Sequence, residues 1–401
     1  MSRAREIAIC GAGIGGLSVG IFLARAGDKV RLFDQFEAPK PLGSGLMLQP
    51  TGLAVLAELG LREEIEALGS RISRLWGIST PSGRPVLDVR YENWQADLYG
   101  LGVQRGMVFQ QLLSTALAAG IEVVSNTAIR SVDAESGRIE LTDGKQIGPF
   151  DLVIDALGVR SPLSPAPQRD LSYGALWATL PWPDGDRFNA QALEQRYFRA
   201  SQMAGVMASG RLSTEAPSTL TYFWSIRADQ EPSWRTSDLE SWKQKAQSLW
   251  PDTGVLLDQF TRHEELTFAR YTHRTKKDPI SGPRLVHIGD AWHAASPQLG
   301  QGANMALLDA WALARALQRE PEDLAEALRI YKHLRRGHVQ LYQIITWLFT
   351  PVYQGDSRLL PWLRDWLAAP LSRLWPAPPL LAALVCGQIG SPLRRLGLEA
   401  D

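Results

Sequence analysis

The chain has 401 residues, in which 42 basic and 42 acidic side chains cancel to a net charge of zero. This length is enough for two domains, or for one large composite domain, with an ample core. Because the charges cancel, we expect no basic field for nucleic acid or anionic lipid, and therefore small-molecule partners and no nucleic acid.

Two cysteines and six histidines show no spacing typical of a metal or redox site, so neither a metal site nor a disulfide is expected. The apolar runs are too short for a transmembrane segment, and the first apolar stretch is too short for a signal peptide. We therefore expect a cytoplasmic protein.

The N-terminal residues have the pattern of a dinucleotide-binding βαβ unit. A buried strand leads into a turn with Gly11, Gly13 and Gly16, an apolar helix follows, and the next strand ends in Asp34. The three glycines serve the tight turn, the approach of the backbone to a pyrophosphate, and the contact between helix and strand. We expect Asp34 to accept hydrogen bonds from the ribose hydroxyls of an adenosine.

A glycine- and proline-rich stretch at 39–50 predicts a loop whose backbone passes close to the cofactor at 43–46, including Ser44 and Gly45. Residues 76–91 then alternate in polarity around a Pro-Ser-Gly turn, which predicts a hairpin and suggests a second sheet.

Helical periodicity is expected over 102–119, with Arg105 at its start. Arg105 could pair with the pyrophosphate from there, and a solvated surface arginine is an equally open interpretation. Strands are predicted at 121–124, 139–141 and 150–156.

From 162 to 277, prolines and glycines separate short segments of strand character, which predicts an inserted, sheet-rich domain covering one side of the ligand. Tyr222 and Trp224 alternate on one of these strands and could face a substrate ring, although core packing explains them equally well. Arg199 is a weak candidate for holding a substrate carboxylate.

A second glycine segment lies at 284–317. A strand ends at Gly289-Asp290, a loop carries Pro297, Gly300 and Gly302, and a long apolar helix begins at about Gly302. The carboxylate can accept hydrogen bonds from a polyol, the glycines let the backbone approach a flat ring, and the helix N-terminus favours negative charge on that ring. The alternative is an ordinary connection between strand and helix. Beyond it, we expect a helix at 324–334 and further helices at 339–384, interrupted at Pro351 and at later prolines.

Taken together, these motifs resemble the FAD-dependent aromatic hydroxylases, the class A flavoprotein monooxygenases of the p-hydroxybenzoate hydroxylase type. Residues 11–16 resemble the ADP-binding motif of that family, and 289–304 are similar to its second flavin motif, GDAxHxxxPxxGQGxN. Arg105 resembles the family arginine that contacts the cofactor. The resemblance covers most of residues 1–335.

The fold implied by the resemblance is α/β, a Rossmann-like FAD-binding domain of the glutathione-reductase type with an inserted, mainly antiparallel β-sheet substrate domain and C-terminal helices. The FAD-binding domain would comprise 1–75, 100–161 and 278–335. The substrate domain would comprise 76–99 and 162–277, and a helical segment would occupy 336–401.

The implied activity is hydroxylation or epoxidation of an aromatic or polycyclic small molecule by O₂, through a flavin C4a-hydroperoxide, with NADH or NADPH as reductant. FAD would be bound non-covalently, no catalytic protein residue is assigned, and the protein would be a monomer or a homodimer. Pro297 would touch both flavin and substrate, and His293 is expected to bond to the backbone rather than act as a base. The resemblance implies cofactor contacts from Gly11, Gly13, Gly16, Asp34, Ser44, Gly45, Arg105, Gly289, Asp290, Pro297, Gly300, Gln301, Gly302, Ala303 and Asn304.

The chain departs from the family in the motif that normally reads DLVIGADGVRS, because Leu157 replaces the aspartate before Gly158 and an acid stands at Asp155 instead. The family aspartate is associated with flavin and nicotinamide binding, which puts efficient reduction in question. Asp155 could substitute only if its side chain reaches the same space, and the other interpretation is a tolerated local replacement.

Three other functions stay open at this point. A flavin-dependent reductase or dehydrogenase on the same scaffold would make Leu157 less surprising. A flavin-dependent halogenase is disfavoured because its WxWxIP motif does not occur. A non-enzymatic flavin-binding protein is the remaining alternative.

Overall fold

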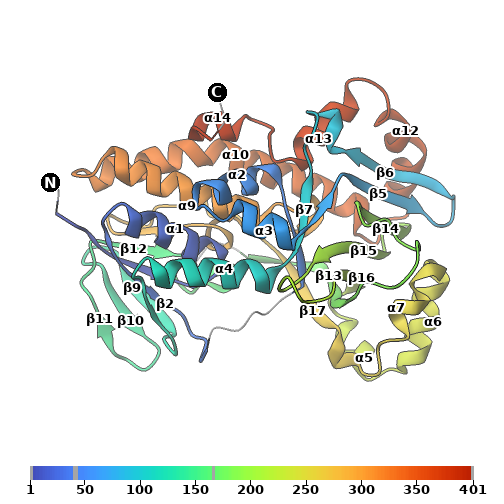
Figure 1. The fold of residues 1–401 in the computed structure, drawn as a ribbon, viewed down its shortest axis with the longest axis horizontal. Coiled ribbons are helices and arrows are strands. Elements are labelled where there is room, and N and C mark those ends of the chain that lie inside the picture. The colour runs from blue at the N-terminus through green and yellow to red at the C-terminus, as the bar shows by residue number, and fades with distance from the viewer. Residues whose placement is uncertain (1–2, 39–43, 165–167, 399–401) are drawn as a thin grey trace.

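The computed structural model describes residues 3–38, 44–164 and 168–398. One part is built on a parallel sheet and the other on a mainly antiparallel sheet, and long helices run along the first part (Figure 1). This arrangement confirms the predicted α/β fold class.

The parallel sheet forms because its strands are apolar on both faces and are covered from both sides. Its five strands lie in the order β18 (Leu285–His287), β12 (Leu152–Asp155), β1 (Glu6–Cys10), β2 (Lys29–Phe33) and β8 (Glu122–Val124). Helices cover one face, namely α1 (Ile14–Arg25), α4 (Arg105–Ala118) and α9 (Gly302–Arg319). A three-stranded sheet covers the other face, with β9 (Ile129–Asp133), β10 (Arg138–Leu141) and β11 (Gln146–Ile147).

The two glycine segments leave this sheet at the same edge. Gly11 follows β1 and Gly289 follows soon after β18, and β1, β12 and β18 are parallel. The carboxyl ends of parallel strands share an edge, and ligands of open α/β sheets bind there. Segments almost 280 residues apart in sequence are thereby brought to one side of the molecule.

A small antiparallel sheet joins the two parts, with strands β3 (Gly45–Leu48), β7 (Gly100–Gln104) and β4 (Ser70–Ile72) and helices α2 (Pro50–Glu58) and α3 (Arg62–Leu68). The helix expected from residue 102 therefore starts later, at Arg105. The reason is a close contact, because a Cβ on Gly102 would lie 2.0 Å from the carbonyl oxygen of Ala208. The part of the predicted loop at 39–43 lies outside the described residues.

The larger sheet has seven strands in the order β17 (Thr267–Arg274), β13 (Gln168–Pro181), β16 (Thr219–Arg227), β15 (Gln202–Gly210), β14 (Ala192–Phe198), β5 (Arg74–Ser79) and β6 (Arg84–Arg90). The hairpin β5–β6, from the earlier part of the chain, adds to β14 in parallel. One face is covered by α5 (Glu231–Arg235), α6 (Leu239–Leu249) and α7 (Gly254–Leu257). The other face is left for the ligand cavity.

The C-terminal helices span both parts. They are α10 (Leu324–Tyr353), α11 (Leu359–Leu363), a π-helical turn (Arg364–Ala368), α12 (Ala369–Leu371), α13 (Ala377–Val385) and α14 (Pro392–Leu396). The break expected at Pro351 is wrong, because this proline lies in the last turn of α10 and the helix continues to Tyr353. The expected boundary at 336 falls inside α10.

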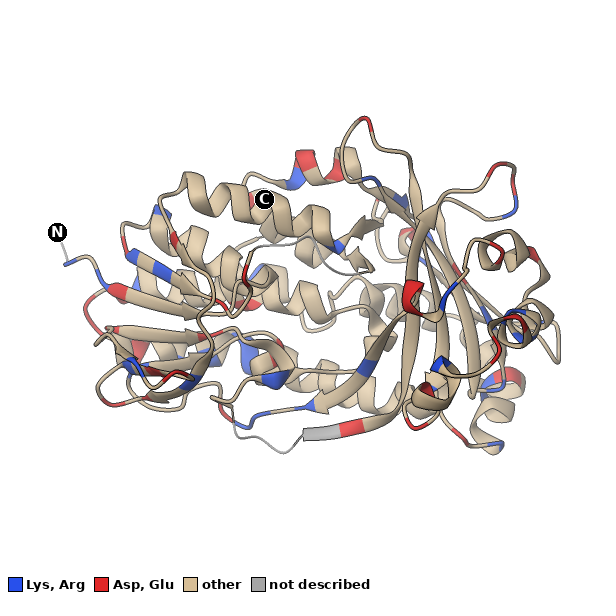
Figure 2. Ribbon diagram, turned by 90° about the horizontal axis from the view of Figure 1, so that it is seen from below, with Lys and Arg blue, Asp and Glu red and all other residues tan. Residues whose placement is uncertain are grey.

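Basic and acidic residues are interspersed over both parts of the molecule (Figure 2). None of the described helices is long and apolar enough to cross a membrane.

Candidate functional site

The first glycine turn combines two glycines that the fold requires with one that faces open space. Gly11 has φ +108°, and a Cβ on Gly16 would lie 1.9 Å from the carbonyl oxygen of Gly11. Gly13 instead caps the N-terminus of α1, and no described atom lies within 4 Å of a Cβ built on it. An anionic group could therefore approach the N-terminus of α1 at Gly13.

Asp34 lies directly after β2, beside this turn. One carboxylate oxygen accepts a hydrogen bond from the Ala12 N–H at 2.6 Å, and the other accepts from the Phe36 N–H at 3.2 Å. The side chain is half-buried. A carboxylate has about four acceptor positions, so Asp34 can accept further donors such as a pair of hydroxyls.

The second glycine segment forms a short helix, a tight turn and a long helix. Asp290 starts α8 (Asp290–His293), Pro297 starts a 3₁₀ turn, and Gly300 (φ +62°) leads into α9 at Gly302. A Cβ on Gly302 would have no described atom within 4 Å, as at Gly13. The N-terminus of α9 is therefore open to a ligand as well.

Asp290 and Arg105 line the same cavity. Protein surrounds the Asp290 carboxyl group, although solvent reaches it through the cavity, and this burial raises its pKa. Electrostatic interactions with His293 and Arg105 oppose that effect on the Asp290 pKa. Asp290 is thus an acceptor at the cavity wall that gains from donors placed in the cavity.

Two predicted cofactor residues use their side chains to hold the loop rather than to reach the cavity. The Asn304 amide donates to the carbonyl oxygens of Met47 and Gly300, and its oxygen accepts from the Gln49 N–H at 2.8 Å. The Gln301 amide donates to the Val385 carbonyl oxygen at 2.6 Å. These side chains therefore fix the second glycine segment against β3 and α13.

Beneath that segment lies a buried charge network that the sequence did not reveal. Asp309 accepts from the Gly289 N–H at 2.9 Å, from His293 Nε2 at 2.6 Å and from Arg335 Nε at 2.7 Å. Burial alone would raise the pKa of Asp309, but His293 and Arg335 outweigh it and hold the pKa below its ordinary value. His293 bonds to this carboxylate and not to the backbone, which corrects the expectation. The one available signal was Asp309, the charged residue in the apolar stretch 302–314.

Asp155 does not take the place of the missing aspartate. It is fully buried and bonds to Ser161 Oγ at 2.6 Å, His287 Nδ1 at 2.7 Å and the Leu157 N–H at 3.1 Å. All these contacts lie inside the protein. The half-buried Leu157 leaves its position without a carboxylate.

A cavity of about 990 Å³ lies between the second glycine segment and the large sheet. Eight of the predicted cofactor residues line it, namely Ser44, Gly45, Arg105, Asp290, Pro297, Gly300, Gly302 and Ala303. The far walls are mostly apolar and come from β6, the open face of the large sheet and the C-terminal helices, with Val86, Trp177, Met203, Met207, Phe223, Phe349 and Leu381 among the lining residues. The flat ring of a cofactor and an apolar ligand could share this space.

The structure does not place Tyr222, Trp224 or Arg199 in the lining of the cavity, and for the two aromatic residues it favours the core-packing interpretation. Tyr222 and Trp224 lie on the face of β16 that packs against α6 and α7, where Trp224 contacts Trp242. Their neighbour Phe223 faces the cavity. Arg199 lies exposed in a turn with φ +58°, away from the cavity lining. Sequence reasoning missed Phe223 because residues of the strand are apolar on both faces.

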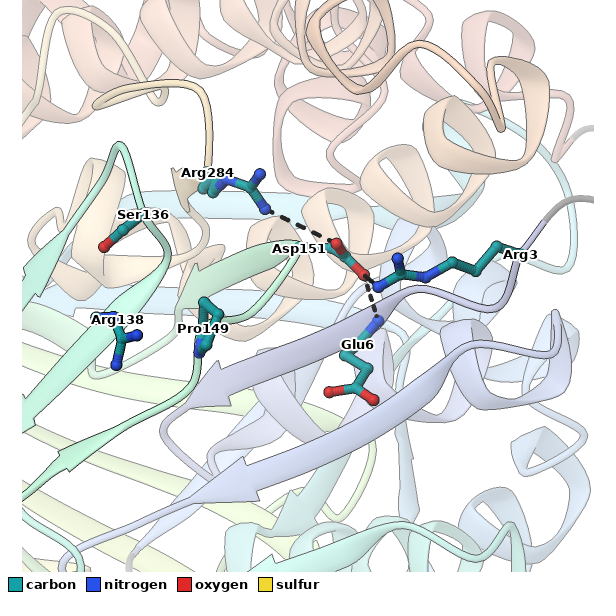
Figure 3. Close-up of a pocket in the computed structure, with 7 residues that line it drawn as sticks. All are labelled: Arg3, Glu6, Ser136, Arg138, Pro149, Asp151 and Arg284. Atoms are coloured by element: carbon teal, nitrogen blue, oxygen red, sulfur yellow. Dashed lines mark hydrogen bonds and ion pairs between the residues drawn. The ribbon is translucent and has the colours of Figure 1, made fainter.

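A second, polar depression of about 340 Å³ lies at the opposite edge of the parallel sheet (Figure 3). Its arginines Arg3 and Arg284 pair with Asp151, at 3.5 Å and 3.8 Å. Glu6 begins β1 and Asp151 precedes β12, so this depression is at the amino ends of the strands. That edge is not where α/β sheets bind their ligands.

The chain is similar to known proteins over most of its length. A family described as FAD binding domain matches residues 4–342. The chain is 27% identical over 367 residues to 6-hydroxynicotinate 3-monooxygenase of Bordetella bronchiseptica, covering 86% of this chain and 92% of that protein. It is 29% identical over 349 residues to a putative 2-heptyl-3-hydroxy-4(1H)-quinolone synthase of Rhodococcus erythropolis, covering 84% and 85%. A solved mutant of 2-methyl-3-hydroxypyridine-5-carboxylic acid oxygenase has a similar fold, with TM-score 0.77, 21% identity and 98% of each chain covered.

Proposed function

Because this chain belongs to the FAD-dependent aromatic hydroxylase family and is an FAD-dependent monooxygenase, we propose that its substrate is an aromatic ring with an apolar substituent. The observation that carries this proposal is the apolar wall of the 990 Å³ cavity beside the second glycine segment.

The residues at both glycine turns fit FAD. Open space at Gly13 and Gly302 leaves room for a bound group at the N-termini of α1 and α9. Asp34 near the first turn and Asp290 near the second have acceptor positions left for the ribose hydroxyls and for the ribityl chain. We assign the adenosine end of FAD to the first turn and the flavin ring to the cavity at the second.

When bound, FAD would supply the redox chemistry, with NADH or NADPH as reductant, by which one oxygen atom of O₂ is transferred to the aromatic ring and the other leaves as water. The protein positions the reactants around it. Pro297, Gly300 and Gly302 form the wall where ring and substrate would meet, and the N-terminus of α9 favours negative charge on the ring. The apolar walls exclude water from the reacting atoms.

The arginines that line the cavity argue against a carboxylated substrate. Among the described residues lining the cavity, the arginines are Arg105, which we assign to the cofactor, and Arg270 and Arg364, which pair with Asp170 and Asp365. A substrate carboxylate would therefore have to compete for one of these arginines, and burying it unpaired would be costly. An alkylated quinolone, the type of compound named for the Rhodococcus relative, meets this constraint better than a nicotinate does.

Gln195 is our candidate for orienting the substrate. It is buried and lines the cavity, and its amide oxygen accepts from the Tyr197 hydroxyl at 2.9 Å. Its amide nitrogen has only a weak contact with the Met203 sulfur, at 3.6 Å. That N–H can donate to a carbonyl or hydroxyl oxygen on the substrate ring.

The test uses the FAD-loaded protein and three matched ligands, 2-heptyl-4(1H)-quinolone, unsubstituted 4(1H)-quinolone and 6-hydroxynicotinate. We expect the heptyl compound to shift the visible flavin spectrum at the lowest concentration and to stimulate O₂-dependent oxidation of NADH or NADPH. Tighter binding of 6-hydroxynicotinate than of the heptyl compound would refute the proposed substrate class.

A further inference from the structure

Exposed large apolar side chains are concentrated in one short segment of the chain. Of 15 such residues on the described surface, 11 lie between residues 344 and 380. They include four tryptophans, and Trp375 is 86% exposed. Monomeric soluble proteins rarely expose apolar patches of this kind without a binding partner.

Helical periodicity places these side chains together. Leu359, Trp362 and Trp366 are spaced by three and four residues along α11 and the π-helical turn, and Leu367, Leu371 and Leu374 form the adjacent stripe. The short helices pack on β6, and the end of α10 contacts α11, so one continuous surface results. Figure 1 shows α12 and α13 gathered beside β5 and β6. We call residues 344–380 the apolar surface.

The apolar surface borders the substrate cavity where the cavity opens to solvent. Leu348, Leu371 and Leu380 are each more than half exposed, and each also lines the cavity. A rigid protein partner over this surface would cover the opening. A fluid lipid layer would leave it accessible to an apolar compound dissolved in the lipid.

The charges at the rim suit phospholipid headgroups. Arg358 and Arg373 are exposed and form no ion pair with any described residue, and Arg84 lies over the Trp366 ring. The exposed acid of the segment, Asp356, is paired with Arg227. Although the whole chain has no net charge, this rim is locally positive.

We propose that the apolar surface docks on a phospholipid bilayer without crossing it, and that the cavity takes its substrate from that bilayer. Tryptophan favours the interface between lipid and water, and short amphipathic helices bind there with their apolar side buried in the lipid. The docking is independent of the reaction, whereas the entry route rests on the proposed function.

The test is cosedimentation of the FAD-loaded full chain with vesicles of phosphatidylcholine alone and with about a third phosphatidylglycerol. We expect binding to both, stronger with the anionic lipid. Leu367→Ser/Leu374→Ser changes two residues that do not line the cavity, and it should lower the partition coefficient about tenfold or more. The matched control is Leu117→Ser/Leu212→Ser, two exposed leucines elsewhere, which should bind as the parent does.

Retained flavin absorbance and an unchanged Tm show that each variant is folded. If the double variant fails this check, Trp375→Ser takes its place, because that side chain is almost fully exposed. Absence of vesicle binding by the parent protein, or equal loss in the control, would overturn the proposal. The proposal would also be overturned if the parent protein does not bind vesicles and instead forms a dimer in sedimentation velocity, and if the double variant is a monomer. Vesicle binding needs no turnover, so its result is separate from that of the substrate test.

Discussion

Replacing Gly13 by alanine should weaken FAD binding at the first glycine turn without destabilising the fold of that turn. Gly13 has φ −71° and ψ −179°, a conformation that alanine adopts freely, and an added Cβ meets no described atom within 4 Å. The apoprotein should therefore be as stable as the parent, or more stable by about 0.4–1 kcal/mol through the unfolded state. Gly16 offers the contrast, because its added Cβ would lie 1.9 Å from the Gly11 carbonyl oxygen.

The same Cβ on Gly13 would occupy space that we assign to the FAD diphosphate. Losing one charge-assisted hydrogen bond from the backbone costs about 1.5–3 kcal/mol. The Kd for FAD should accordingly rise by about ten- to a hundredfold. FAD titration followed by flavin fluorescence, together with thermal unfolding of the apoprotein, measures both effects. An unchanged Kd, or a Gly13→Ala apoprotein as unstable as Gly16→Ala, would refute the assignment.

Three further predictions concern the replaced aspartate, the cavity wall and the buried network. Leu157→Asp should speed anaerobic bleaching of the flavin by NADH or NADPH if the missing carboxylate limits reduction, and an unchanged rate removes that idea. Phe223→Ala should raise the KM for an apolar substrate about tenfold, whereas Tyr222→Phe should leave the KM unchanged. Tyr222→Phe should also raise the unfolding free energy by about 1 kcal/mol, because it removes a buried hydroxyl with no described partner. Equal changes in KM would contradict the assigned faces of β16. Burial, together with Arg335, lowers the pKa of His338 from 6.5 to about 3, so between these pH values the unfolded state binds more protons and stability falls as the pH drops. In chemical denaturation at several pH values, His338→Gln should flatten that fall by at most about 1.4 kcal/mol per pH unit. Parallel pH profiles of the parent and the variant would show the reasoning to be wrong.

The two glycine turns could be predicted from sequence because their requirements are local. A tight turn, a helix N-terminus and an acid at the end of a strand all lie within about 30 residues of chain. Asp290 could be placed for the same reason. What the sequence left open was which side chains of these motifs hold the loop and which reach the cavity, as with Gln301 and Asn304.

Tertiary contacts explain the predictions that were wrong. β16 is apolar on both faces because α6 and α7 cover one face and the cavity lies on the other, so alternation could not decide between Trp224 and Phe223. Gly102 looked like part of a helix, but its position is set by the backbone of β15, about 100 residues later. Likewise, Asp309 meets Arg335 and His293 only when α9, α10 and α8 are assembled.

The central claim is that this protein uses FAD and O₂ to oxygenate an apolar aromatic compound. The most direct measurement is turnover of the FAD-loaded protein under ¹⁸O₂ with NADH or NADPH and 2-heptyl-4(1H)-quinolone, followed by mass spectrometry of the product. We predict one ¹⁸O atom per product molecule and no product without O₂. Product formed under strict anaerobiosis, or product oxygen derived from water, would contradict the account.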